Sequence, residues 1–278
     1  MPTVLITGAA RGIGRATAAA LAAKGWDVLG GVRRPEDGVA LAAGDSRIRP
    51  VVLDITSAEH LAALPQALPE RLDALVNNAG IAVTGPLEGL PLDVLRHQLE
   101  VNLVGQVGVT QAALPALRAA RGRIVFVSSL SGRVAQPLFG ACNASKFALE
   151  GMADALRLEV HPWGIRVALV EPAQTDTDMW RNATEQFDRD LAEVSEESRR
   201  LYAPHIAAAR KLIPRSQKMA SPVAGVVGAI EKALTSSRPR ARYVVGTAPR
   251  VQAVLADMTP TRMLDAGLRK VSGIPDEL

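Results

Sequence analysis

The chain has 278 residues, of which 48% are hydrophobic and 22% charged, a balance typical of a globular protein rather than a disordered one. The net charge is only +4, and the basic residues form no stripe interleaved with aromatic residues, which argues against a nucleic-acid-binding protein. A single cysteine excludes an internal disulfide and a multi-cysteine metal site, and the four histidines are too scattered for a ligand set, so we expect no metal.

The first apolar segment begins almost at the first residue, with Thr3, Val4 and Leu5. This leaves no room for a charged leader followed by a cleavable signal. No uninterrupted apolar run approaches the length needed to span a membrane. We therefore expect a soluble, cytoplasmic protein.

Short β-branched segments alternate along the chain with segments of helical character. This alternation predicts an α/β fold with a single doubly wound parallel sheet of the Rossmann type. The expected strands cover residues 4–6, 28–32, 48–53, 74–76, 124–127, 165–170 and 242–246. One helix should follow the first strand and end near residue 24, and a short one should begin at residue 57. Further helices should cover 92–118, 143–160 and 222–234, the last with a cap at Ser221.

Residues 173–220 break the alternation, because they are polar, charged and compatible with helix. An insertion after the sixth strand lies over the ligand crevice of such a fold, so we expect a helical substrate lid. Met179, Trp180 and Phe187 could shape the substrate pocket, although packing of the lid on the core explains each of them equally well. Residues 249–278 should form one or two helices as a C-terminal tail. No linker or repeat divides residues 1–278, which we expect to be one domain.

Three glycines follow the first strand: Gly8, Gly12 and Gly14. In a strand–turn–helix unit, Gly8 would permit a tight turn, Gly12 would let the backbone approach a phosphate, and Gly14 would let the helix pack closely on the strand. The amino terminus of the helix would then face a pyrophosphate. The segment therefore predicts a dinucleotide site.

The end of the second strand indicates which dinucleotide is bound. Folds that prefer NAD place an acidic residue there to hold the ribose hydroxyls, but this strand ends in Arg33 and Arg34, and Asp27 lies at its other end. Guanidinium groups suit a phosphate, so Arg33, with help from Arg11, predicts NADP. The alternative is two solvated arginines before a turn at Pro35.

The stretch after the strand at 124–127 brings together groups suited to catalysis. Ser128 and Ser129 follow this strand directly, and Lys146 lies on the next helix. A hydroxyl and an ammonium group can therefore meet at the carboxyl edge of the sheet, where open α/β folds bind their ligands.

Six motifs occur along the chain: TGAARGIG at 7–14, NNAG at 77–80, NLVG at 102–105, the serines at 128–129, ASK at 144–146 and EPAQTDT at 171–177. Taken together, in order and spacing, they resemble those of the short-chain dehydrogenase/reductase family over roughly the whole chain. The lid and the tail resemble members that act on retinoids, steroids and other lipophilic alcohols or ketones.

The resemblance implies a role for each matched residue. Asn102 would hold a water that feeds a proton relay, Ser129 would bind the substrate oxygen, and Lys146 would grip the nicotinamide ribose and lower the pKa of a neighbouring acid. It also implies a homodimer or homotetramer formed through the two long helices, acting on a small lipophilic substrate. The implied cofactor contacts are Gly8, Arg11, Gly12, Ile13 and Gly14 at the phosphates, Asp54 and Ile55 at the adenine, Asn77, Ala79 and Gly80 at the ribose, and Pro172, Thr175 and Thr177 at the nicotinamide.

The sequence departs from the family at the proton donor. The family has a tyrosine thirteen residues after the serine and four before the lysine, and Cys142 stands there. A thiol is shorter than a phenol, and we expect Lys146 and the nicotinamide to make it a thiolate, a poor donor. Catalysis should then be severely impaired.

Three explanations for Cys142 remain open. It is an introduced or sampled substitution in an otherwise ordinary reductase, or it marks a cofactor-binding sensor or scaffold that has lost catalysis. In the third, another group such as Tyr202 on the lid donates the proton.

Overall fold

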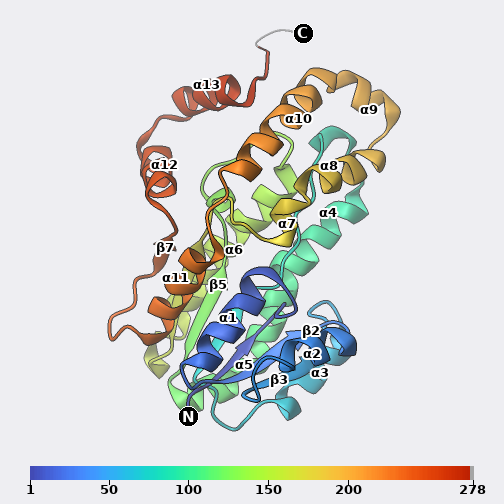
Figure 1. Cartoon of the computed structure of the whole chain (residues 1–278). Coiled ribbons are helices and arrows are strands. Elements are labelled where there is room, and N and C mark those ends of the chain that lie inside the picture. Colours follow the sequence, from blue (N-terminus) through green and yellow to red (C-terminus); the bar gives the residue numbers. More distant parts are fainter. Residues whose placement is uncertain (276–278) are drawn as a thin grey trace.

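Seven parallel strands form one sheet in the order β3-β2-β1-β4-β5-β6-β7 in the computed structural model, which describes residues 1–275 (Figure 1). The chain runs outward from β1 to β3, returns to β4 on the other side of β1, and continues to β7. The predicted doubly wound sheet is confirmed, and the reversal of strand order beside β1 opens a crevice at the carboxyl ends of the strands. The strands are β1 Thr3–Ile6, β2 Asp27–Val32, β3 Ile48–Val52, β4 Ala74–Asn77, β5 Arg123–Val127, β6 Arg166–Glu171 and β7 Arg242–Val244.

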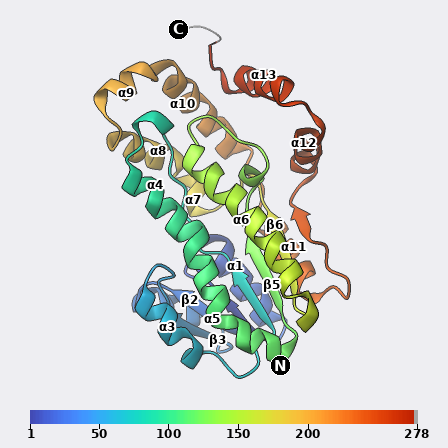
Figure 2. The ribbon, with the colours of Figure 1, turned by 180° about the vertical axis from the view of Figure 1, so that it is seen from behind.

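Successive residues of each central strand point to opposite faces of the sheet and enter two separate cores. In β1, Val4 and Ile6 belong to the core that α1 and α11 cover, whereas Leu5 belongs to the core that α3, α5 and α6 cover. The two views in Figures 1 and 2 show these helix layers on either side of the sheet. Both faces are buried, which is why the strands are apolar throughout.

The helices follow the predicted alternation, with one that the sequence reading did not predict. Residues 35–42 form α2, because Pro35 occupies the first turn and Glu36 and Asp37 follow it, all favourable at a helix amino terminus. The helices of the sheet layers are α1 Gly12–Ala23, α2 Pro35–Ala42, α3 Ala58–Ala67, α4 Leu92–Leu99, α5 Gly105–Ala120, α6 Gly140–Glu159 and α11 Val223–Thr235; short turns η1 Leu87–Gly89, η3 Leu130–Gly132 and η4 His161–Trp163 join them.

Two predicted helix details were wrong. The long helix expected at 92–118 is divided by a wider π-type turn, η2, at Glu100–Val104, where the amide of Gly105 bonds to the carbonyl of Glu100. The expected cap Ser221 instead forms a parallel bridge with Thr175, and Pro222 takes the cap position. In both places, contacts between segments distant in the sequence set the backbone conformation.

The insertion after β6 forms α7 Asp178–Arg181, α8 Ala183–Ala192, α9 Glu196–Leu201 and α10 Ala203–Lys218, which lie beyond the carboxyl ends of the strands (Figure 1). Phe187, Leu191, Ile206 and Ile213 bury one another in a small core with Leu138. Phe187 is thus a core residue of this layer. Whether the layer acts as a lid stays a prediction.

Asp190 of α8 joins this layer to the body of the protein. Its carboxylate accepts hydrogen bonds from the backbone amide and the hydroxyl of Thr84, at 2.9 and 2.7 Å, and it is buried. Charge-assisted bonds of this kind are roughly twice as strong as neutral ones, so α8 is fixed over the loop that follows β4.

The tail consists of two helices, α12 Thr247–Met258 and α13 Thr261–Ser272, as expected. They continue past the carboxyl end of β7, apart from the sheet layers, and α13 reaches α10 (Figure 2). Within residues 1–275, no helix combines the length and apolar character that crossing a membrane requires.

Candidate functional site

The turn between β1 and α1 has the geometry that its glycines predict. Gly8 and Gly12 have φ of +63° and +54°, a region that side chains disfavour. A Cβ on Gly14 would lie 2.3 Å from the carbonyl oxygen of Gly8 and 2.6 Å from Nδ2 of Asn78. Gly14 therefore lets α1 pack closely against the turn. Gly12 leaves the backbone of the turn uncovered by a side chain.

We expect Gly14→Ala to lower the free energy of unfolding by about 3 kcal/mol, because the added methyl group has no space beside the Gly8 carbonyl. Urea unfolding measures the change. The matched control is Gly151→Ala on α6, where a Cβ meets nothing within 4 Å. That variant should gain about 0.5–1 kcal/mol, since alanine is the better helix former. Equal stability of the Gly14→Ala variant and the unaltered protein would contradict the packing role.

Basic side chains gather at the end of β2. Arg34 forms a bidentate hydrogen-bonded pair with Asp37, which lowers the pKa of that carboxyl, and the charges of Arg11 and Arg33 lower it further. Arg33 is exposed and forms no hydrogen bond or ion pair within the described part of the chain. The cation predicted to meet a 2′-phosphate is thus available.

The residues predicted at the adenine form a short, internally bonded turn after β3. Burial opposes ionisation of Asp54, but two hydrogen bonds from Thr56 and the charge of Arg33 outweigh it and lower the pKa of Asp54. Ile55 is buried, and a Cβ on Gly105 would lie 2.6 Å from its carbonyl oxygen. The turn is therefore fixed against α5.

The motif at 77–80 is tied to the glycine turn. Asn77 is fully buried and donates to the hydroxyl of Thr110 on α5, so its side chain braces the end of β4. Asn78, to which the sequence analysis gave no role, donates to the carbonyl oxygens of Thr7 and Gly8 at 2.9 and 3.2 Å. In the sequence, only its place in the NNAG motif at 77–80 indicated a role for Asn78. The ribose contacts of Asn77, Ala79 and Gly80 stay predictions.

Ser129 lies where β5 ends, between two bonds that continue the β5–β6 ladder. The amides of Ser128 and Leu130 donate to the carbonyls of Val170 and Pro172, at 2.8 and 2.9 Å. The Ser129 hydroxyl accepts from the amide of Ser131 and donates weakly to the Pro172 carbonyl at 3.4 Å. It can therefore exchange that long bond for one to a substrate oxygen.

Lys146 lies in the second turn of α6 and is buried. Its ammonium donates to the carbonyl of Val127 at 3.0 Å, at the end of β5. Burial lowers the pKa of Lys146, while the neighbouring Cys142 and Glu150 act in the opposite direction. A strand carbonyl thus holds the ammonium close to the Ser129 turn.

Cys142 lies one turn before Lys146 and is also buried. Burial raises the pKa of its thiol, and the charge of Lys146 only partly offsets this. The prediction of a thiolate was wrong, because it considered the neighbouring charge and ignored desolvation. The thiol stays protonated at neutral pH. Its short reach and high pKa, rather than loss of its proton, limit it as a donor.

Asn102 lies in the π-type turn, and its side chain is fully bonded. Its Oδ1 accepts from the amide of Ile81, and its Nδ2 donates to the Ile81 carbonyl and to the hydroxyl of Ser145. Because the side-chain amide of Asn102 is already bonded, a water of the proton relay would have to bind to the backbone of the π-type turn. Ser145, which the sequence reading did not assign, donates to the Cys142 carbonyl and so links the turn to α6.

The segment after β6 faces the glycine turn. A Cβ on Gly12 would lie 3.5 Å from the side chain of Thr177, so the two segments lie in contact across the crevice. Thr175 is buried, and its hydroxyl donates to the Ala173 carbonyl. Pro172, Thr175 and Thr177 follow the carboxyl end of β6, and their contacts with a nicotinamide stay predictions.

The hydroxyl of Tyr202 already has a hydrogen-bond partner. Its hydroxyl donates to Glu88 of η1 at 2.9 Å, and its ring packs with the small core of α8 and α10. This bond raises the pKa of Tyr202. A hydroxyl held in this way does not support the explanation in which Tyr202 replaces the missing donor.

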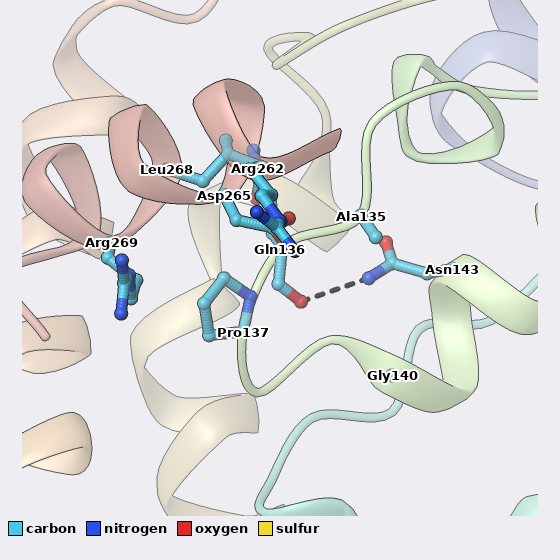
Figure 3. A pocket seen from close by; sticks show the side chains of 9 residues that line it. All are labelled: Ala135, Gln136, Pro137, Gly140, Asn143, Arg262, Asp265, Leu268 and Arg269. Carbon is cyan, nitrogen blue, oxygen red and sulfur yellow. Dashed lines mark hydrogen bonds between the residues drawn. The ribbon is translucent and has the colours of Figure 1, made fainter. Parts of the chain in front are cut away.

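An open pocket of about 740 Å³ lies between the loop before α6 and α13, and none of Asn102, Ser129, Cys142 and Lys146 lines it (Figure 3). The side chain of Asn143, the residue after Cys142, borders it, and its Nδ2 donates to the Gln136 carbonyl. The lining residues are Ala135, Gln136, Pro137, Gly140, Asn143, Arg262, Asp265, Leu268 and Arg269.

Comparison with known proteins agrees with this arrangement. Residues 2–188 match the family described as short chain dehydrogenase. The chain belongs to this family. It is 32% identical to an NADPH-dependent 3-dehydrocapnine reductase of Ornithobacterium rhinotracheale, over 95% of each chain, and 34% identical to human retinol dehydrogenase 16, over 98% of this chain and 89% of that one.

A solved short chain dehydrogenase from Burkholderia cenocepacia, in complex with NADP, superposes with a TM-score of 0.76 at 28% identity, covering 96% of this chain and 97% of that one. The predicted family resemblance is confirmed. The named relatives are reductases and dehydrogenases, which supports an oxidoreductase activity for this short-chain dehydrogenase. Proteins of this family bind a nicotinamide cofactor. The glycine turn, with no side chain at Gly8, Gly12 or Gly14, has the free backbone that a phosphate would need, and the contacts assigned to the cofactor stay predictions.

Proposed function

We propose that this short-chain dehydrogenase is an NADP(H)-dependent oxidoreductase that acts between a lipophilic secondary alcohol and its ketone, or on an aldehyde. The observation that carries the proposal is the junction of Ser129 and Lys146. The Ser129 hydroxyl is bonded to the Pro172 carbonyl just after β6, and the Lys146 ammonium is bonded to the Val127 carbonyl at the end of β5, so both groups are held at the carboxyl ends of neighbouring strands.

Each residue contributes a separate part of the chemistry. The bound cofactor supplies or accepts the hydride. The Ser129 hydroxyl holds the substrate oxygen as charge develops on it. The Lys146 ammonium, held by Val127, fixes the ribose and lowers the cost of negative charge nearby. Cys142 occupies the place of the proton donor, which it fills poorly, so turnover of this chain is impaired.

The buried thiol also favours a second function, a catalytically inactive NADP(H)-binding sensor or scaffold. Cys142 is the only matched catalytic position that lacks the group hydride transfer needs, while the glycine turn and Lys146 are intact. The two functions share cofactor binding and differ in turnover once a donor is restored.

Support for a lipophilic substrate comes from the relatives and from the cavity beside Asn143. Relatives named as 3-ketodihydrosphingosine reductase and retinol dehydrogenase share about a third of their residues with this chain. Pro137 and Leu268 give the cavity apolar walls, and Arg262 and Asp265 give it a polar end. That combination suits a long molecule with a polar end. A homodimer or homotetramer stays a prediction.

Binding measurements test the cofactor. We expect Arg33→Gln to weaken NADPH binding by about 10–100-fold, the effect of losing charge-assisted bonds to a phosphate. NADH affinity should change by less than about threefold, since NADH has no 2′-phosphate. Fluorescence titration of the reduced cofactor gives both constants without turnover.

Arg34→Gln is the matched control, because Arg34 is a neighbouring exposed arginine already paired with Asp37. Its loss should affect NADPH binding less than the loss of Arg33. Tighter binding of NADH than of NADPH by the unaltered protein would disprove the NADP assignment.

A further inference from the structure

A cluster of charged side chains lies behind the Ser129 turn. Glu171, the last residue of β6, is fully buried, and neither of its carboxylate oxygens has a hydrogen bond within residues 1–275. Two arginines approach the same oxygen, Arg133 at 3.6 Å and Arg242 at 3.4 Å. Burial of a carboxylate is costly unless cations compensate for it, so this arrangement calls for an explanation.

The two arginines connect Glu171 to other elements. Arg242 of β7 bonds to Glu150 of α6 at 2.9 Å and to Asp154 of α6 at 2.6 Å. Arg133 forms a second ion pair with Asp257 of α12. The cluster thus joins the Ser129 turn, the end of β6, the helix that carries Lys146, and the C-terminal tail.

Arg133 closes the turn that begins at Ser129. The amide of Leu130 bonds to the Pro172 carbonyl, and the amide of Arg133 bonds back to the Leu130 carbonyl. The Arg133 side chain then reaches Glu171, the residue before Pro172. The turn is therefore attached to the end of β6 by its backbone and by one ion pair.

Close packing leaves this turn little freedom to move independently of α6. A Cβ on Gly132 would lie 3.0 Å from Cγ of Glu150, 3.1 Å from the carbonyl oxygen of Lys146 and 3.2 Å from the hydroxyl of Ser128. A shift of the turn is therefore felt by the helix of Lys146 as well as by Ser129.

We propose that Arg133 and Glu171 are positioning residues for Ser129: their ion pair locks the turn at 130–133 against the end of β6, and α12 holds Arg133 in place through Asp257. Neither side chain acts on the reacting atoms. That this ion pair positions a catalytic serine rests on the proposed function. That it holds the turn in place does not.

The lock depends on pH. Burial and the charge of Glu150 raise the pKa of Glu171 to about 7, Arg133 and Arg242 act against this, and Asp257 adds to it. Glu171 therefore gains a proton as the pH falls through about 7. Its ion pair with Arg133 is then lost, and the turn loosens.

Hydrogen exchange of the full-length protein, followed by mass spectrometry over peptides covering 129–134, measures the lock between about pH 6 and pH 8. With rates corrected for intrinsic pH dependence, exchange in the unaltered protein should rise about tenfold toward the acid side, with its midpoint near pH 7. Arg133→Gln should exchange fast at every pH, and Glu171→Gln should show no midpoint. Arg133→Lys, which keeps the charge, should retain the midpoint.

Two further variants test the charges next to the Arg133–Glu171 pair. Glu150→Gln removes a negative charge that raises the pKa of Glu171, so its midpoint should fall. Asp257→Asn should increase exchange at 129–134 by a smaller factor than Arg133→Gln, since the pair with Glu171 remains. Arg47→Gln, which breaks only a surface pair with Asp45, is the control and should change nothing.

Equal exchange in Arg133→Gln and the unaltered protein, or an unchanged midpoint in Glu171→Gln, overturns the proposal. Because exchange needs no turnover, absence of activity in a protein with a restored proton donor contradicts the proposed function and leaves the lock intact. Where that protein is active, Arg133→Gln should lower kcat about tenfold and leave the NADPH dissociation constant within about twofold. An effect on binding alone contradicts positioning.

Discussion

Cys142→Tyr is expected to raise ketone reduction by about 10²–10⁴-fold over the unaltered protein, the range that a positioned general acid contributes. A phenol places its proton several ångströms beyond a thiol, toward the oxygen that Ser129 holds. Burial raises the pKa of the Cys142 thiol, so the present side chain keeps its proton and donates it poorly. Steady-state rates on a panel of lipophilic ketones, aldehydes and alcohols with NADPH measure the change.

Cys142→Phe is the matched control, because it adds the ring without the hydroxyl. It should remain as slow as the unaltered protein, and all three forms should bind NADPH with dissociation constants within about threefold. A tyrosine form that binds NADPH but turns over nothing on a broad panel would favour the sensor or scaffold. Fast turnover by the unaltered protein that Tyr202→Phe abolishes would restore the lid tyrosine as the donor.

The second large effect is a pH dependence of stability that comes from Glu171. Its pKa is about 7 in the folded protein against an ordinary value of 4.5, so between these values the folded state binds more protons than the unfolded state. Stability therefore falls as the pH rises through this interval. At about 1.4 kcal/mol for each pKa unit, the Glu171 contribution to the free energy of unfolding falls by about 2.5 kcal/mol from pH 5 to pH 8.

Urea unfolding of the unaltered protein and of Glu171→Gln across this range isolates the contribution. Groups whose pKa is lowered in the folded protein, such as Asp54 and Asp154, make stability rise with pH instead. They are present in both proteins, so their contributions cancel in the difference. Glu185→Gln, which alters an exposed carboxylate, should run parallel to the unaltered protein. Parallel curves for Glu171→Gln would show that Glu171 is ionised over the whole range.

Local signals in the sequence predicted the fold and the backbone geometry of the glycine turn well. The alternation of apolar strands with helices gave the sheet, because a strand buried on both faces must be apolar throughout. Glycine at 8, 12 and 14 gave the first turn, because the required backbone conformation and close contact leave few other choices. Each of these signals depends on residues near one another in the chain.

Other features of the site could not be predicted from neighbouring residues. Asn102 lies in a π-type turn rather than a regular helix, where its side chain bonds to Ile81 and to Ser145 of α6. The direction of the Cys142 pKa shift was missed, since burial depends on helices and loops packed around it. Desolvation is a property of the assembled fold, whereas a charge one helical turn away is visible in the sequence.

The sequence by itself determined the family, the doubly wound sheet, the glycine turn after β1, and the absence of tyrosine from position 142. Only the tertiary structure decided how Ser129 is held. Arg133 and Asp257 are 124 positions apart in the chain, and Arg242 and Glu150 are 92 apart, yet both pairs meet behind the same turn. Ion pairs form where folding brings charges together in a buried place, and no local pattern of residues encodes that distance.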